Sequence, residues 1–216
     1  MKIISLSIIF LSFIQFCYAQ TNKWEFGMEG GPNQSSVSGS KTPEYQGTLD
    51  NYLLGFDAQY NITDNFSINA GINSEIKGYS QTFSYFSRLS GAEPYGTYTN
   101  YTSLGYVTFP ILAKASIGHK IKFFVNAGPY FGYLVGAPSK VVYQDSVGKQ
   151  IVSSTSNRNV FKQIDIGACG GVGFEIPLND KLVFSLEGRY SPGFLNIDNT
   201  GSYNFKNQSS DFILGL

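Results

Sequence analysis

Alternation of apolar and polar residues recurs along most of this chain and restricts its fold more than any other feature. Successive side chains of a β-strand point to opposite faces, so this period predicts strands with one apolar and one polar face. Eight such segments are expected, at residues 24–29, 52–62, 66–75, 107–117, 123–133, 164–176, 182–190 and 212–216. After the first 20 residues, no segment has the run of about 18 apolar residues that a membrane-spanning helix needs. The chain is therefore predicted to be all-β.

The connections between these segments alternate in length. Three are tight polar turns, at residues 63–65, 118–120 and 178–180. Four are long and rich in Ser, Thr, Asn, Gly and Tyr, at residues 33–51, 80–100, 137–160 and 195–210. This layout predicts an eight-stranded antiparallel up-and-down transmembrane β-barrel with short periplasmic turns and long extracellular loops.

The apolar faces of the strands are expected to point outward. A packed eight-stranded barrel holds only about twelve side chains in its central layers, far fewer than the apolar positions of these segments. In water, an apolar exterior of this extent would exceed the roughly few hundred Å² that a soluble monomer tolerates. A soluble lipocalin-like carrier is therefore disfavoured, and lipid is the expected surroundings. Aromatic residues near the strand ends predict two interfacial belts, with Trp24, Phe66, Phe123 and Phe184 beside the short turns and Tyr101, Tyr106, Tyr133, Tyr190 and Phe194 beside the long loops.

The N-terminus has the pattern of a secretory signal peptide. Lys2 precedes an apolar stretch from Ile3 to Phe16, and Ala19 provides a small residue for cleavage. A membrane anchor is disfavoured because the stretch is shorter than the about 20 residues of a spanning helix. A lipoprotein signal at Cys17 is disfavoured because the bulky Phe16 precedes it. Residues 1–19 are thus expected to be removed, leaving a barrel domain at 20–216 in the bacterial outer membrane with Cys169 as its one cysteine and no internal disulfide.

The charge content excludes one large class of function. The chain has 15 basic and 15 acidic residues and a formal net charge of +0. It therefore has no basic field that would attract a phosphate backbone, and nucleic acid is not an expected partner.

Four segments carry a family resemblance: YVTFPILAK at 106–114, FVNAGPYFGYLVG at 124–136, FKQIDIGACGGVGFE at 161–175 and LEGRYSPGFLNI at 186–197. Together they resemble the porin-family outer-membrane β-barrel domain abundant in the Bacteroidetes, over essentially the whole mature chain. The resemblance implies contact with outer-membrane lipid and lipopolysaccharide and with the outer-membrane assembly machinery, but little about activity. In that family the last strand is of full length. Here only six residues follow Ser210, so a truncated last strand and incomplete closure against residues 24–28 are expected.

The polar faces of the strands predict a charged lumen. An ion network is expected there, formed by Glu25, Glu29, Asp57, Glu75, Lys114, Asp165, Glu175, Glu187 and Arg189. Buried charges must be paired or lose their charge, so Lys114 and Arg189 are expected at the centres of this network. The favoured interpretation is a polar plug that stabilises the barrel, and the alternative is a narrow cation-preferring channel along the excess carboxylates. No cofactor and no metal site is expected.

Catalysis is not expected. His119, the one histidine, lies in a predicted periplasmic turn, so a histidine-dependent triad is not available beside the outer leaflet. Cys169 has no histidine near it in the pattern, and the glycines around it are interpreted as close packing rather than as a phosphate-binding loop. The long loops are rich in Tyr, Ser, Asn and Gly, a composition typical of adaptable recognition surfaces. The sequence therefore predicts a structural role or a surface interaction with an unidentified extracellular ligand.

Overall fold

The computed structural model describes residues 23–39, 46–86, 94–145, 150–179 and 181–216, so the expected signal peptide at 1–19 lies outside the described residues. These residues form eleven strands and one short 3₁₀ helix. The elements are β1 (Trp24–Ser38), β2 (Gln46–Gly47), β3 (Leu49–Thr63), β4 (Phe66–Phe86), β5 (Pro94–Gly118), β6 (Lys122–Gly136), β7 (Pro138–Asp145), β8 (Gln150–Ser156), η2 (Arg158–Val160), β9 (Ile164–Asn179), β10 (Leu182–Pro192) and β11 (Lys206–Gly215). No helix among the described residues is long and apolar enough to cross a membrane.

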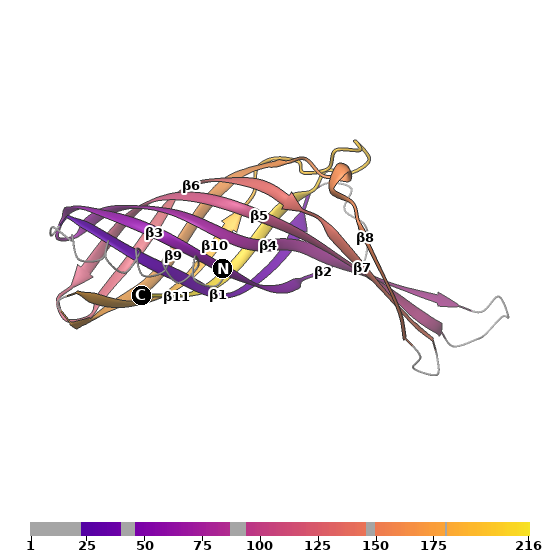
Figure 1. Cartoon of the computed structure of the whole chain (residues 1–216), viewed down its shortest axis with the longest axis horizontal. Coiled ribbons are helices and arrows are strands. Elements are labelled where there is room, and N and C mark those ends of the chain that lie inside the picture. Colours follow the sequence, from indigo (N-terminus) through magenta and orange to yellow (C-terminus); the bar gives the residue numbers. More distant parts are fainter. Residues whose placement is uncertain (1–22, 40–45, 87–93, 146–149, 180) are drawn as a thin grey trace, which may run out of the picture.

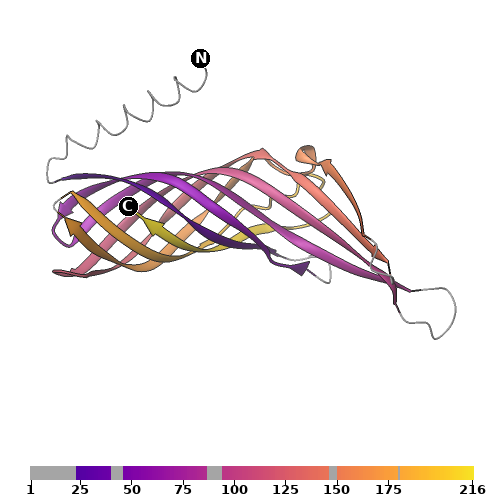
Figure 2. The same cartoon turned by 60° about the horizontal axis from the view of Figure 1, so that its bottom comes forward.

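Eight of the strands close into a ring. Each strand pairs antiparallel with its neighbours in the order β4-β3-β1-β11-β10-β9-β6-β5, and the β4–β5 pairing closes the circle (Figures 1 and 2). The prediction of an all-β, eight-stranded, up-and-down antiparallel barrel is confirmed. Tight connections join β3 to β4, β5 to β6 and β9 to β10 at one end of the ring, which we call the short-turn end; the opposite end is the long-loop end.

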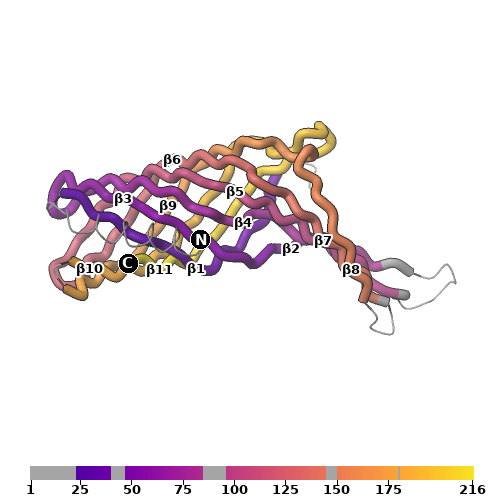
Figure 3. Tube along the Cα trace, viewed as in Figure 1, coloured from indigo at the N-terminus to yellow at the C-terminus, as the bar shows by residue number. Residues whose placement is uncertain are grey.

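Three further strands make the long connections more regular than expected. Residues 80–100 and 137–160 were predicted to be loops, but β4 and β5 continue through much of the first, and β7 and β8 form a hairpin in the second. β7 pairs with β5 at residues 96–102, so β4, β5, β7 and β8 form a sheet that projects beyond the ring (Figure 3). We call this four-stranded extension the projecting sheet. The prediction failed in β7 and β8 because apolar and polar residues do not alternate regularly there, whereas the backbone pairing persists.

The last strand is longer than predicted. β11 begins at Lys206 rather than near Phe212, and it pairs with β1 on one side and β10 on the other. The backbone of Met28 exchanges hydrogen bonds of 2.9 and 3.0 Å with that of Leu216. Within the described residues, Trp24–Gly27 pair with β3, and the pairing of β1 with β11 runs from Met28 to Ser38.

The two faces of the ring differ as predicted. Outward side chains are large and apolar, and many are about half exposed, such as Phe26, Ile111 and Val125. Inward positions are mostly polar or charged over the half near the short turns, whereas buried apolar side chains gather over the half near the long loops. The ring therefore has an apolar exterior and an interior divided between two chemistries.

Candidate functional site

Arg189 lies at the centre of the charged interior. Its guanidinium donates to both carboxylate oxygens of Glu29, at 3.1 and 3.0 Å, and to both of Glu187, at 2.7 and 3.0 Å. Asn73 on β4 donates to Glu29 at 2.7 Å, and Asn126 on β6 donates to Glu187 at 3.1 Å, each across one intervening strand. The planar fork of an arginine suits this double bidentate contact, and a lysine could not make it. β1, β4, β6 and β10 are thus joined across the interior.

Lys77 forms a second centre that the sequence analysis missed. Its side chain is buried, with Nζ 3.0 Å from Glu75 Oε1 and 3.5 Å from Asp165 Oδ2. The ammonium lies 4.0 Å from the centre of the Tyr130 ring, which adds a cation–π contact. Lys77 follows Glu75 by two residues, so the two side chains point to the same face of β4. That spacing could have revealed it, had the strand not been expected to end at Glu75.

Lys114 forms a third centre nearer the short-turn end. Its ammonium pairs with Glu175, donates to Gln59 Oε1 at 2.9 Å, and lies 4.4 Å from the centre of the Phe124 ring. Gln59 and Asn61 both donate to the neighbouring Glu25, which the structure places at this end of the interior. The amides therefore extend the polar contacts beyond the reach of the lysine.

Asp57 and Asp211 complete the set of inward carboxylates. Asp57 accepts a 2.7 Å hydrogen bond from Asn69, and Asp211 accepts one from Asn33. Asp211 was not among the predicted residues because β11 was expected to begin after it. In the described part of the chain the inward carboxylates are Glu25, Glu29, Asp57, Glu75, Asp165, Glu175, Glu187 and Asp211, and the inward cations are Lys77, Lys114 and Arg189, with Lys122 half-buried at the short-turn end. Carboxylates therefore outnumber cations in the interior.

Glycines on β9 make room for these side chains. A Cβ at Gly171 would lie 2.3 Å from Glu187 Oε1, and a Cβ at Gly167 would lie 2.4 Å from the Tyr130 ring. The close-packing interpretation of this glycine run therefore fits the structure. No helix follows the run to make a phosphate-binding loop, because β9 continues to Asn179.

An apolar cluster occupies the interior near the long-loop end. Val37, Leu104 and Leu134 point inward from strands, and Phe161, Ile197 and Phe205 join them from connecting segments. Tyr106 also belongs to this cluster and is only 1% exposed, so its predicted place in an outer aromatic belt is wrong. Tyr106 lies an even number of residues from Thr108 and Leu112 on β5, so all three side chains are on the same, inward face of the strand.

The connection between β10 and β11 is held in place by side-chain hydrogen bonds. Asp198 accepts from the amide of Tyr203 at 2.9 Å and from the hydroxyl and amide of Thr200. Burial opposes ionisation of Asp198, but these hydrogen bonds outweigh it and lower the pKa of its carboxyl below the ordinary value. Ile197 and Phe205 are linked by a 2.8 Å backbone hydrogen bond, which positions both side chains in the apolar cluster.

The candidate catalytic residues are not brought together. Cys169 is buried beside Ser191, whose hydroxyl donates to the sulfur at 3.3 Å. His119 is exposed in the β5–β6 turn at the opposite end of β5 from the projecting sheet. Within the described ranges, no three His, Cys, Asp or Glu side chains are grouped as if to hold a metal ion.

The chain matches one family of known domains and is similar to several solved structures. The family described as "Outer membrane protein beta-barrel domain" matches residues 18–199. Among solved structures, Neisserial surface protein A is 12% identical, with 88% of this chain and 94% of that chain covered and a TM-score of 0.47. The attachment invasion locus protein of Yersinia pestis is 9% identical, with coverages of 89% and 97% and a TM-score of 0.41. OprG from Pseudomonas aeruginosa is 11% identical, with coverages of 89% and 94% and a TM-score of 0.42. No curated protein matches the chain.

Proposed function

Because this chain belongs to the outer membrane protein β-barrel domain family, we propose that it is a non-enzymatic barrel with a closed lumen, which acts at the cell surface through its projecting sheet. The apolar exterior of the ring then faces the lipid and lipopolysaccharide of the outer membrane. Export by a cleaved signal peptide at residues 1–19 and insertion by the outer-membrane assembly machinery belong to the same proposal. So does its orientation, with the short turns in the periplasm and the projecting sheet outside the cell. The narrower likeness to the Bacteroidetes members of the family stays a prediction.

The projecting sheet is the observation that carries the proposal. β4 and β5 have 21 and 25 residues, whereas β3 and β6 have 15 each. The part of β5 that extends past β6 is about ten residues long, or roughly 33 Å of strand. Cross-strand contacts stabilise it, including the Phe83–Tyr98 ring pair at 6.2 Å. A barrel that served only as a wall or a pore would not need a sheet of this length.

Strand β8 gives the projecting sheet an open edge. In the described residues it pairs with β7 alone, and all its residues from Gln150 to Ser156 are exposed. Natural edge strands are usually protected by charges, proline or bulges, and β8 has no charged residue and no proline. Such an edge can accept an extended polypeptide as an additional strand. We therefore expect the extracellular partner to be an extended segment of another protein.

The apolar cluster supports a closed lumen. Leu104, Leu134 and Ile197 are each 0% exposed, and an ion could not pass between them without losing its hydration. The alternative function, a narrow cation-preferring channel, is favoured by the inward carboxylates that lack a cationic partner within salt-bridge distance, such as Asp57. Conductance of the folded protein in planar bilayers separates the two functions. The proposal predicts no steps, and steady cation-preferring steps would favour the channel.

Removal of the hairpin tests the surface role. The amide of Asn157 donates to the carbonyl of Ala137 at 3.0 Å, so the base of the hairpin is narrow. Residues 138–156 can therefore be replaced by an Asn-Gly turn with little strain on the ring. Casein immobilised on a surface serves as the extended polypeptide probe. Cells that display the wild-type protein should bind to it, and cells that display the variant without the hairpin should not.

A finer variant tests the edge itself. Val152→Lys with Ser154→Lys adds charge to β8 without removing it, and Ser202→Lys adds charge to the exposed β10–β11 connection as the matched control. We expect the first variant to lose binding and the control to keep it. Equal binding by all folded variants would refute the edge as the binding surface.

A further inference from the structure

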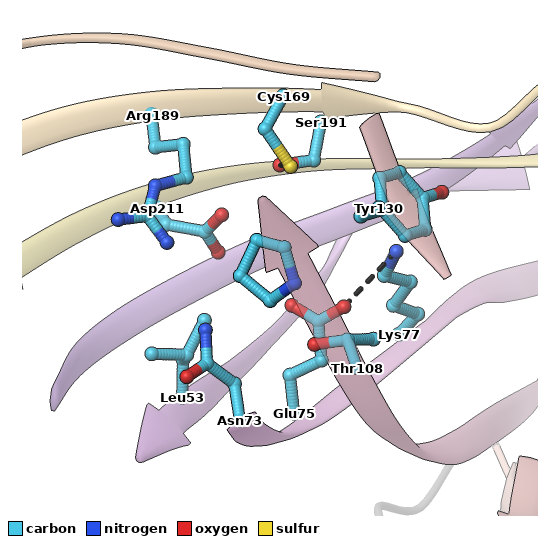
Figure 4. A pocket seen from close by; sticks show the side chains of 11 residues that line it. Leu53, Asn73, Glu75, Lys77, Thr108, Tyr130, Cys169, Arg189, Ser191 and Asp211 are labelled. Atoms are coloured by element: carbon cyan, nitrogen blue, oxygen red, sulfur yellow. Dashed lines mark hydrogen bonds and ion pairs between the residues drawn. The ribbon is translucent and has the colours of Figure 1, made fainter. Parts of the chain in front are cut away.

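The charged interior leaves little room for a ligand. Between the Arg189 and Lys77 centres lies a cavity of about 10 Å³, which is close to the space of one water molecule. Figure 4 shows the side chains that surround it, with Lys77 and Glu75 joined by their ion pair. A larger molecule does not fit this cavity, whereas the projecting sheet presents large side chains at its surface.

A row of large side chains crosses one face of the projecting sheet. Phe83 on β4 lies opposite Tyr98 on β5. Tyr98 in turn lies opposite Tyr143 on β7, and Tyr143 lies opposite Ile151 on β8. Because neighbouring strands are about 4.8 Å apart, these residues form a stripe roughly 14 Å long and one residue wide. We call these four residues the aromatic row.

The aromatic row is exposed although it is largely apolar. Phe83, Tyr98 and Ile151 are 41%, 38% and 57% exposed. Cross-strand contact between aromatic rings stabilises a sheet, and this accounts for Phe83 beside Tyr98. It does not require that the row continue across all four strands to the open edge. Contiguous exposed apolar surface marks an interaction site.

The next row toward the ring is mostly polar and carries no charge. It consists, in register across the same four strands, of Gln81, Asn100, Val141 and Ser153. An amide group can both donate and accept hydrogen bonds, and so can a hydroxyl. This face of the sheet therefore presents a narrow apolar stripe beside groups that can bind hydroxyls.

The opposite face of the sheet argues against lipid as the occupant. On that face the hydroxyls of Thr82 and Thr99 are 3.1 Å apart, and Thr97 and Ser84 form the next pair. Where the ring is expected to face hydrocarbon, its outward side chains are apolar, as at Ile111. The polar outward face therefore indicates that the projecting sheet lies beyond the lipid, with the aromatic row open to water.

We propose that the aromatic row binds a neutral, flat, β-linked polysaccharide chain outside the cell. The sugar rings of such a chain present C–H groups on their faces and hydroxyls along their edges. The negative face of an aromatic ring attracts the C–H groups, and Gln81 and Asn100 lie on the same face to bind the hydroxyls. The uncharged rows favour a neutral chain over an acidic one. The straight, narrow stripe favours a flat chain over a coiled one.

The aromatic row and the β8 edge are separate surfaces of the projecting sheet. An extended polypeptide at the edge pairs with backbone groups, whereas the sugar contacts side chains on one face. Val152 and Ser154, which the edge variant replaces, lie on the face of β8 opposite to Ile151. Loss of sugar binding therefore leaves casein binding unchanged, so the two proposals fail or succeed independently.

Saturation-transfer NMR with cellohexaose provides the test. The folded mature protein is kept in an amine-oxide detergent, which has no sugar headgroup, and saturation should pass to the C–H protons of the sugar. Tyr98→Ala should weaken binding by roughly two- to tenfold, the worth of one aromatic contact. Tyr98→Phe should retain binding because the ring remains. Tyr101→Ala is the matched control, since it removes a tyrosine from the opposite face of the same strand.

Heat-modifiable gel mobility shows which variants are folded. If Tyr98→Ala does not fold, the variant without residues 138–156, which lacks half of the aromatic row, takes its place. Absence of transfer with the wild type, or equal binding by Tyr98→Ala and Tyr101→Ala, would overturn the proposal. Tighter binding of maltohexaose or of a galacturonic acid hexamer would overturn the choice of a flat or a neutral chain. Displacement of cellohexaose by purified lipopolysaccharide would overturn the choice of a free polysaccharide.

Discussion

Replacement of Arg189 by methionine tests whether the buried ion network holds the barrel together. The arginine side chain is 5% exposed and makes four hydrogen bonds with two glutamates. Arg189→Met retains most of the volume but leaves Glu29 and Glu187 as adjacent buried charges without their cation. Removal of one partner from a buried pair costs about 3–5 kcal/mol. For a chain of this length, that loss corresponds to a fall of roughly 6–20 °C in the unfolding midpoint.

Removal of the charges from the two glutamates should restore much of this loss. The triple variant Arg189→Met, Glu29→Gln, Glu187→Gln has no charge at this centre, and each new glutamine oxygen can still accept from Asn73 or Asn126. An apolar or neutral replacement of a whole buried network is often close to neutral in stability. Arg189→Lys should lie between the single and triple variants, because a lysine keeps the charge but cannot make both bidentate contacts.

The assay is the temperature at which the folded form disappears in heat-modifiable gel electrophoresis. Lys120→Met, an exposed change in the β5–β6 turn, is the control and should lie within about 0.5 kcal/mol of wild type. A single variant as stable as wild type would refute the reasoning. So would a triple variant as unstable as the single one, since the cost would then come from lost packing and not from unpaired charge.

Three further outcomes are expected. Ile197→Ala, in the apolar cluster, should cost about 2–4 kcal/mol of folding stability by the same assay, whereas Leu195→Ala, which is 39% exposed, should cost far less. Ile111→Arg, on the apolar exterior, should cost about 2–4 kcal/mol if lipid surrounds it, and equal stability of Ile111→Arg and Ile111→Leu in bilayers would contradict a lipid-facing position. The lowered pKa of Asp198 stabilises the β10–β11 connection above the ordinary aspartate pKa, and this contribution is lost as the pH falls below about 4 through the lowered value. Protease cleavage of that connection should therefore increase at acid pH in the wild type, and Asp198→Asn should remove the pH dependence.

The period-two pattern predicts the ring and most of the inward residues because each strand of the ring has apolar residues outside and mostly polar residues inside. The pattern fails where the two faces no longer differ in polarity. Beyond Glu75 the outward residues include Gly78 and Ser80, so the contrast between the two faces fades although the strand continues through Lys77. The same holds for residues 206–211, which are polar on both faces, and for this reason Asp211 was missed.

The apolar cluster could not be predicted from a pattern of this kind. Phe161, Ile197 and Phe205 belong to connections with no repeating period, and their burial depends on the path of the chain over the long-loop end. The Phe161–Asp198 bridge and the hydrogen bond from Lys162 to Ile197 join two connections that are distant in sequence. Such pairings are set by the closed ring and not by local preference.

The division of the interior into a charged half and an apolar half is what the proposed closed lumen rests on. Charges are tolerated in the charged half because ion pairs with Arg189, Lys77 and Lys114 and hydrogen bonds from amide side chains hold them. Near the long-loop end the connections contribute Ile197, Phe161 and Phe205, which remove the need for polar partners there. β4 and β5 run without a break from the charged half, past this apolar cluster, into the projecting sheet. A strand bound at the edge of β8 would therefore be anchored to the membrane through continuous β-structure, while the interior stays sealed beneath it.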